Sequence, residues 1–215
     1  MKSTLINMVA VLFTITLIAS AGVGAVNMIT VEPIAAAKAA ATQQALGQVL
    51  PAFDATEQTA LTIDEMPIVV YTAKSGDAVV GYAVESMTKQ GFSGVVKLMV
   101  GFLPDGTVNN INVLQQAETP GLGTKMCDEG NPLISSIQNR KLEKQLAVKK
   151  DGGDVDALTA ATISSRAYVD AVNRAWMAMT SVVTGSEPTD VASGATPTAD
   201  AAQTEPEAQK GGQNE

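Results

Sequence analysis

Residues 156–166, with the sequence DALTAATISSR, combine small, hydroxyl-bearing and charged side chains directly before an amphipathic segment. A helix that begins here offers free backbone N–H groups and the positive end of its dipole, and both favour an anion such as phosphate. The commoner explanation of such a pattern is that Thr162 or Ser164 only caps the helix. The residues alone leave both interpretations open.

A second stretch, residues 118–125 with the sequence ETPGLGTK, follows a predicted strand. Its proline and two glycines favour a tight loop with accessible backbone amides. Such a loop can hold a phosphate or the edge of a flat ring, and it can equally be an ordinary turn. Its spacing differs from that of a Walker loop or a dinucleotide fingerprint.

The scarce residue types exclude several kinds of chemistry. The 215-residue chain has no His, which excludes a Ser-His-Asp triad and imidazole acid–base catalysis. Its single Cys, Cys127, excludes an intrachain disulfide and a four-cysteine metal site. A net charge of −8 with 4% aromatic residues argues against binding to nucleic acid. We therefore expect the chemistry to belong to a bound cofactor or a partner.

The N-terminal segment is predicted to be a membrane anchor. No charged residue lies between Ser3 and Val31, and the apolar run of residues 5–28 is long enough to cross a bilayer as a helix. Lys2 places the N-terminus in the cytoplasm by the positive-inside rule. The alternative is a cleaved signal peptide, with small residues at 19, 21 and 25 as a cleavage site. Either interpretation exports the rest of the chain.

The remaining chain divides by composition into a stalk, a domain and a tail. We expect the anchor over residues 1–31, a helical stalk leading into the domain over 32–67, the domain over 68–185 and a disordered acidic tail over 186–215. Strands are predicted at 68–72, 78–85, 95–103 and 108–114, and helices at 34–50, 131–148 and 164–183. Because strands and helices do not alternate, the fold class is α+β, with an antiparallel sheet and helices.

The two loop stretches, in this order along the chain, resemble the family of domains that carry FMN covalently. With the single anchor and the Glu32-Pro33-Ile34 start of the stalk, the chain resembles the G subunits of Rnf ion-translocating electron-transport complexes. The resemblance covers about residues 1–182. The family pattern Asp-x-x-Ser/Thr-Gly-Ala/Ser-Thr-x-Ser/Thr is matched at Asp156, Thr159, Ala161, Thr162 and Ser164.

The resemblance implies a cofactor and its site. FMN would be joined through its phosphate to Thr162 by a flavin transferase that acts outside the cytoplasm. Further cofactor contacts would come from Thr159, Ala160, Ala161, Ser164, Glu118, Thr119, Gly121, Leu122 and Gly123. Among these, Glu118 would accept hydrogen bonds from loop backbone, and Ser164 would donate to the phosphate or cap the helix. No side chain is expected to act as a catalytic acid, base or nucleophile.

Two features depart from a simple match. Ala160 stands where the family has Gly, which matters if the site needs a positive φ. Residues 190–198, DVASGATPT, match the whole pattern with Thr196 as the acceptor. We favour Thr162 because it lies between a structured domain and a helix start, whereas Thr196 precedes a proline in the predicted tail. Modification of Thr196 as a second site stays open.

The implied function is that of a membrane-anchored flavoprotein subunit. It would relay electrons within a complex that couples ferredoxin and NAD to ion movement, with other membrane and peripheral subunits as partners. The chain would cross the bacterial inner membrane once and hold the flavin domain on the periplasmic side. Alternatives are the C subunit of a sodium-pumping NADH:quinone reductase, a non-redox exported sensor or assembly domain, and a lone flavoprotein reductase.

Overall fold

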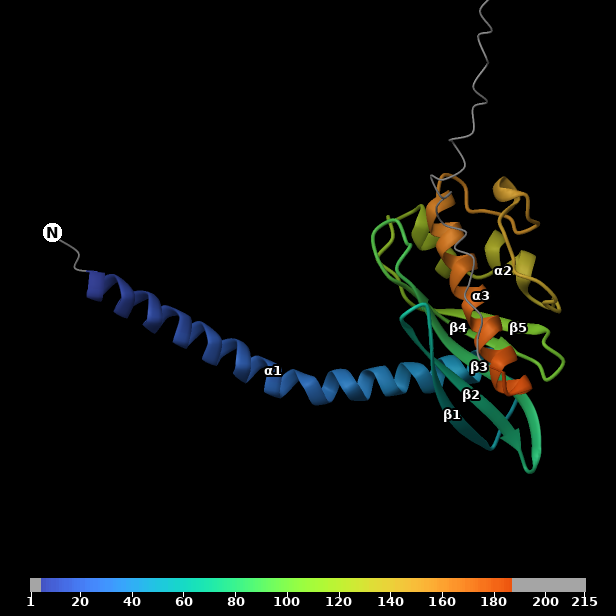
Figure 1. The fold of residues 1–215 in the computed structure, drawn as a ribbon, viewed down its shortest axis with the longest axis horizontal. Helices are drawn as coiled ribbons and strands as arrows, with labels where there is room; N and C mark the ends of the chain where they lie inside the picture. Colours follow the sequence, from blue (N-terminus) through green and yellow to red (C-terminus); the bar gives the residue numbers. More distant parts are fainter. Residues whose placement is uncertain (1–4, 187–215) are drawn as a thin grey trace, which may run out of the picture. The chain divides into compact units, whose positions relative to one another are not determined.

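The computed structural model describes residues 5–186. These form two compact units, of which the first ends at residue 48 and the second begins at residue 49. The tail expected over 186–215, including Thr196, lies outside the described residues apart from Ser186. The first unit consists of the single helix α1, and the second contains a sheet with further helices (Figure 1).

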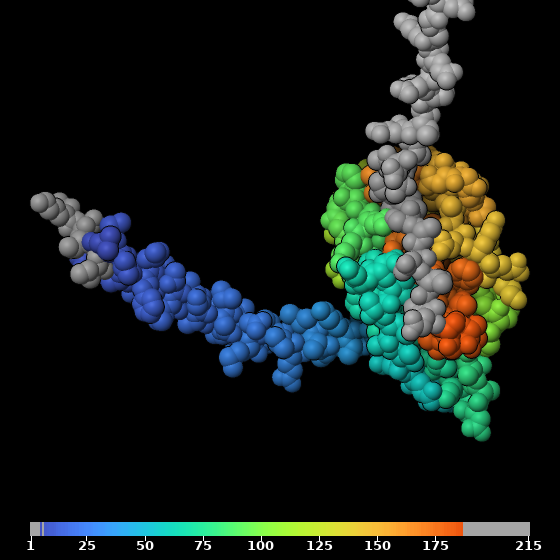
Figure 2. Space-filling model, viewed as in Figure 1, coloured from blue at the N-terminus to red at the C-terminus, as the bar shows by residue number. Residues whose placement is uncertain are grey.

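Helix α1 runs from Leu5 to Val49 (Figure 2). Large apolar side chains are exposed on it between Leu5 and Ile34, whereas Ala45, Leu46 and Val49 near its end are buried. Within the described residues it is the one helix long and apolar enough to cross a membrane. Its 45 residues measure about 67 Å, more than twice the roughly 30 Å of a bilayer core. The helix is therefore long enough to span the membrane and extend well beyond it.

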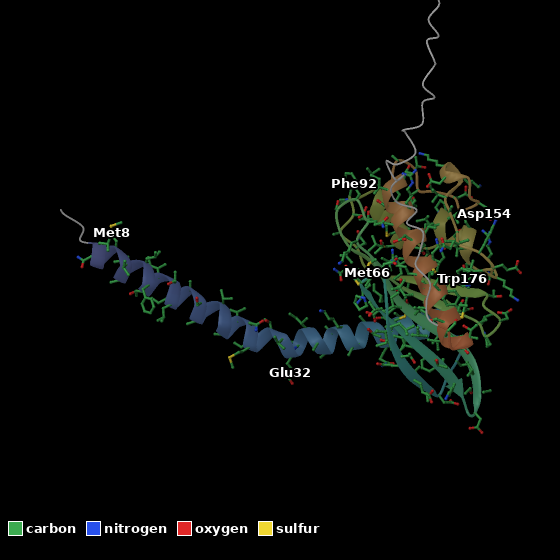
Figure 3. The ribbon with its side chains drawn as sticks, viewed as in Figure 1. Met8, Glu32, Met66, Phe92, Asp154 and Trp176 are labelled. Atoms are coloured by element: carbon green, nitrogen blue, oxygen red, sulfur yellow. The ribbon has the colours of Figure 1, made fainter. Side chains whose placement is uncertain are left out.

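The predicted start of a separate helix at Pro33 was wrong, because Pro33 lies inside the continuous α1. A proline within a helix removes one backbone hydrogen bond and bends the axis, but the turns on either side can persist. Figure 3 places the neighbouring Glu32 at the bend of α1. The proline thus marks a bend, where the sequence pattern indicated a beginning.

The second unit is built on a five-stranded antiparallel sheet in the order β1-β2-β3-β4-β5. Its strands are Ala55–Ile63 (β1), Met66–Ser75 (β2), Ala78–Thr88 (β3), Val96–Phe102 (β4) and Val108–Gln115 (β5). This confirms the predicted α+β class and the four predicted strands. Strand β1 was missed because it is an edge strand with mostly exposed side chains, so its sequence lacks the alternation of a half-buried strand.

Short helical segments follow the sheet, and the long helix predicted over 131–148 is wrong. The helix α2 covers only Pro132–Ile137, and the chain then leaves the helical path, with φ of 62° at Asn139. The backbone N–H of Asn139 donates to Val108 O at 2.8 Å, and that of Val108 to Arg140 O at 2.9 Å. Pairing with the start of β5 therefore replaces the helical hydrogen bonds, and the 3₁₀ turns Gly123–Cys127 (η1) and Lys149–Asp151 (η2) complete the region.

Helix α3, Thr162–Thr184, packs across one face of the sheet (Figure 1). This packing fixes the position of the helix N-terminus. Its apolar face is buried at Tyr168, Ala171, Val172, Ala175 and Met179, whereas Trp176 is only partly buried. The hydroxyl groups of β3 also bind this helix, because Ser86 donates to Ala171 O at 2.8 Å and Thr88 to Asp170 Oδ2 at 2.6 Å.

A buried arginine joins α3 to the hairpin between β1 and β2. Arg174 is 2% exposed and forms salt bridges with Asp170 on its own helix and with Asp64. Asp64 and Glu65 both have positive φ, as the two-residue hairpin turn requires. The ion pairs therefore hold the turn between β1 and β2 against α3.

We predict that Arg174→Ala strongly destabilises the second unit, because it leaves the carboxylate of Asp170 buried without its cationic partner. Breaking a buried pair in this way costs about 3–5 kcal/mol. Thermal unfolding of the detergent-solubilised protein measures the effect, with Lys74→Ala, which removes an exposed pair with Glu57, as the control. Equal melting temperatures for the two variants would contradict the structural role of Arg174.

Candidate functional site

A cleft of about 500 Å³ opens at the N-terminus of α3. Its walls come from the loop between β3 and β4, the loop after β5 and the first turn of α3. The lining residues are Phe92, Thr119, Leu122, Gly123, Ala160, Ala161, Thr162, Ile163 and Ser164. The structure thus brings the two stretches that the sequence singled out into one cleft, while Gly121 and Thr159 are not among its lining residues.

The carboxylate of Glu118 lies behind the cleft and joins all three walls. Glu118 is 4% exposed, accepts a hydrogen bond from the Ser164 hydroxyl, and accepts backbone N–H bonds from Phe92 at 3.3 Å and Ser93 at 3.2 Å. A buried carboxylate needs such donors to replace its water shell. The expectation that Glu118 binds loop backbone is confirmed.

Two glycines allow the walls to approach this carboxylate. A Cβ on Gly123 would lie 2.6 Å from both Glu118 Cβ and Ser164 Oγ, and one on Gly91 would lie 2.2 Å from Gly94 O. Real side-chain atoms do not come so close, so larger residues would push the loops apart. The glycines therefore set how near the loops lie to α3.

The first turn of α3 begins without a side-chain cap. The residue before it, Ala161, has a methyl group that cannot accept a hydrogen bond, and the Ser164 hydroxyl donates to Glu118. The interpretation that Thr162 or Ser164 caps the helix is therefore wrong. The first backbone N–H groups of a helix have no partner within it, so they are available to an anion in the cleft.

Ala160 has the conformation that the family's glycine would supply. Its φ is 58°, in the left-handed region, which strains a residue with a Cβ. The turn is held by Ser165, whose hydroxyl accepts from Leu158 N at 2.9 Å and donates to Ala161 O at 2.8 Å. Sequence reasoning gave Ser165 no role, because its hydroxyl resembles any other in a Ser/Thr-rich stretch.

Three large apolar side chains stand exposed around the cleft. Phe92 is 64% exposed, Ile163 43% and Leu122 40%. Outside α1, the only other large apolar side chain exposed to this degree among the described residues is Val183, at the far end of α3. Apolar surface concentrated at one concave site indicates a ligand or a partner.

The basic side chain of Lys150 contacts the hydroxyl of Thr162, the residue that the sequence motif predicts as the point of cofactor attachment. Lys150 Nζ donates to Thr162 Oγ1 at 2.9 Å. The next residue, Asp151, is bound by Arg166 through Nε at 2.7 Å and Nη2 at 2.5 Å, and this guanidinium holds the pKa of Asp151 below its usual value. Lys149 pairs with Asp156 at 2.6 Å and likewise lowers the pKa of that carboxyl.

Sequence reasoning missed Phe92, Ile163 and Lys150. Phe92 lies in the segment QGFSG between two strands, where a large aromatic flanked by glycines was an available signal. Nothing in the spacing of Lys150 from Thr162 indicated that the chain would fold back to join them.

Comparison with known proteins identifies the family. The FMN-binding domain family matches residues 91–177, which contain every lining residue of the cleft. The G subunit of the ion-translocating oxidoreductase complex from Shewanella baltica is 35% identical over 189 residues, which cover 81% of this chain and 89% of that protein. The chain belongs to the family of G subunits of ion-translocating oxidoreductase complexes.

Other G subunits of this family align over shorter spans. The Escherichia coli K12 protein is 42% identical over 110 residues, 49% of this chain and 53% of its own length. The Haemophilus influenzae protein is 37% identical over 114 residues, 51% of this chain and 55% of its own length. Family membership together with α1 makes the chain a single-pass membrane protein.

The cleft fits an FMN group by its chemistry. A flavin ring is flat and largely apolar, and the exposed side chains of Phe92, Leu122 and Ile163 offer it a matching surface. A phosphate is an anion, and the uncapped start of α3 with Lys150 beside it offers donors and positive charge. Ring and phosphate surfaces lie in the same cleft, as one molecule requires.

We predict that Ala160→Gly stabilises the protein, because glycine adopts φ of 58° without the strain of a Cβ. The gain is expected to be up to about 1 kcal/mol, reduced by the greater freedom of glycine in the unfolded chain. Ala157→Gly is the matched control and should destabilise, since its φ is not positive. Chemical denaturation of both variants checks the prediction, and a change of the same sign in both would contradict it.

Proposed function

We propose that this chain is a flavoprotein subunit that carries FMN on Thr162 and relays electrons within an ion-translocating oxidoreductase complex. The observation that carries this proposal is the position of Thr162. Its hydroxyl lies at the first residue of α3, inside a cleft that combines apolar walls with an uncapped helix start, within the FMN-binding domain.

FMN supplies one- and two-electron transfer, and the protein determines where the group lies and what surrounds it. Thr162 Oγ1 would provide the phosphodiester oxygen. The first backbone N–H groups of α3 would face the phosphate, while Leu122 and Ile163 would exclude water from part of the ring. A covalent bond keeps the group from diffusing away, which suits a relay between subunits.

The structure of the acceptor region supports Thr162 as the modified residue. Thr162 is partly buried, with its backbone fixed by α3 and by the turn that Ser165 holds. Its neighbours in the cleft could shield an attached ring. Thr196 lies outside the described residues, so the preference for Thr162 rests on what surrounds it.

The wider assignment rests on the named relatives. These proteins are G subunits of ion-translocating oxidoreductase complexes, which favours that membership over the C subunit of a quinone reductase. Further membrane and peripheral subunits would supply and accept the electrons, and a flavin transferase would attach the cofactor. The positive charge of Lys2 before the apolar run favours a cytoplasmic N-terminus and a periplasmic flavin domain.

We predict that Thr162→Ala abolishes covalent flavin, because it removes the proposed ester oxygen and little else. The chain is co-expressed with a flavin transferase, exported, denatured and assayed for flavin fluorescence in a gel. Thr162→Ser, which keeps a hydroxyl, should retain part of the signal, and Thr196→Ala should retain all of it. Full fluorescence in Thr162→Ala would place the cofactor elsewhere.

We predict that Cys127 reacts with a membrane-impermeant maleimide in intact spheroplasts, because it is the sole Cys and is exposed on the flavin domain. Partial burial and the neighbouring Asp128 raise the pKa of its thiol, so labelling should be faster at pH ~8.5 than at neutral pH. Cys127→Ser provides the blank. Labelling that occurs only after lysis would place the domain in the cytoplasm.

A further inference from the structure

Lys150 contacts Thr162 at the start of α3. Within residues 5–186 Lys150 belongs to none of the salt bridges, whereas the adjacent Lys149 pairs with Asp156. Its hydrogen bond to Thr162 Oγ1, at 2.9 Å, joins two side chains near the surface. An ammonium without a salt-bridge partner in this part of the chain thus lies against the one hydroxyl proposed to carry a phosphate.

The backbone around Lys150 is fixed relative to α3. The turn η2 is joined to the helix by the two hydrogen bonds from Arg166 to Asp151. Arg166 lies one helical turn after Thr162, so it comes from the same face of α3. On its other side, η2 is followed by Gly153, where a Cβ would lie 2.0 Å from Ala147 O, so this turn requires glycine.

The charge and donors of Lys150 suit a phosphodiester. An ammonium has three donors and no acceptor, so it donates to Thr162 Oγ1 and leaves the hydroxyl proton available to a base of the transferase. As Oγ1 bonds to the phosphorus of the flavin donor, a flavin nucleotide whose phosphate carries a second phosphate group, the bond from that phosphorus to the leaving phosphate breaks. Once Oγ1 is bonded to phosphorus, the same ammonium is within reach of the phosphate oxygens. It then adds a full positive charge to the partial charge at the start of α3.

We infer that Lys150 is a positioning residue of the attachment site: it orients the Thr162 hydroxyl before flavin is joined and neutralises the phosphate afterwards. This inference rests on the proposed function, since it presumes that Thr162 carries the phosphate. It gives the basic turn η2 a role that none of the comparisons assigns.

The first test is the rate at which a flavin transferase loads purified full-length chain in detergent. Lys150→Ala should slow covalent loading about tenfold or more, in line with the loss of one charge-assisted hydrogen bond. Lys150→Arg, which restores a cation, should recover most of the rate. Lys149→Ala is the matched control and should load like wild type, because Lys149 pairs with Asp156 instead of Thr162.

The second test separates a role at the phosphate from a role in recognition by the transferase. In fully loaded protein, Lys150→Ala should shift the ³¹P resonance of the phosphodiester, while Lys149→Ala should leave it in place. Melting temperatures of the unloaded variants should match wild type, since the Lys150 side chain is largely exposed. A slower rate with an unmoved resonance would mean that the transferase alone recognises Lys150, and would overturn the inference.

The outcomes distinguish the inference from the function on which it rests. Wild type that takes up no flavin, or Thr162→Ala that takes up as much as wild type, would overturn the proposed function. Wild type that loads on Thr162 while Lys150→Ala loads equally fast would overturn the inference alone. Equal impairment in Lys149→Ala or Lys150→Arg would also overturn it.

Discussion

The buried carboxylate of Glu118 is the contact on which the geometry of the site depends. It receives hydrogen bonds from the loop of Phe92 and from Ser164, so one side chain sets the distance between two loops and the first turn of α3. A buried carboxylate that loses one donor keeps its desolvation cost, which resists any separation of these walls. The glycines at 91 and 123 provide the space that the carboxylate needs.

The sheet and α3 provide the rigid frame for this contact. The core between them fixes the axis of α3, and Arg174 with Asp170 and Asp64 fixes its position along the sheet. The N-terminus of the helix is therefore held in place without a side-chain cap, which leaves its backbone donors for a ligand. The positive φ of Ala160 is also imposed from outside the residue. The surrounding turn determines this conformation, which alanine by itself disfavours.

The sequence predicted the parts of the fold that have a strong local signal. Strands β2 to β5 are short apolar runs rich in Val and Ile, and the apolar residues of helix α3 recur every three or four positions. The helix predicted over 131–148 was wrong because Leu142 and Leu146 have helical spacing but reach the core from an irregular segment. In that segment Asn139 and Arg140 pair with Val108 at the start of β5. The edge strand β1 was missed since its exposed side chains carry no pattern. At the site, Thr162 and Gly123, which come from the two stretches that the sequence singled out, line one cleft in the structure. The contact of Lys150 with Thr162 depends on a long-range return of the chain that no local pattern encodes.

Tryptic mapping of the protein from its native membrane tests most directly whether Thr162 carries FMN. Cleavage after Lys150 and Arg166 releases residues 151–166, which contain Thr162, whereas Thr196 falls in the separate peptide of residues 175–210. Tandem mass spectrometry should find residues 151–166 heavier by FMN less one water, with the added mass on Thr162. An unmodified 151–166 peptide beside a flavinylated 175–210 peptide would contradict the account.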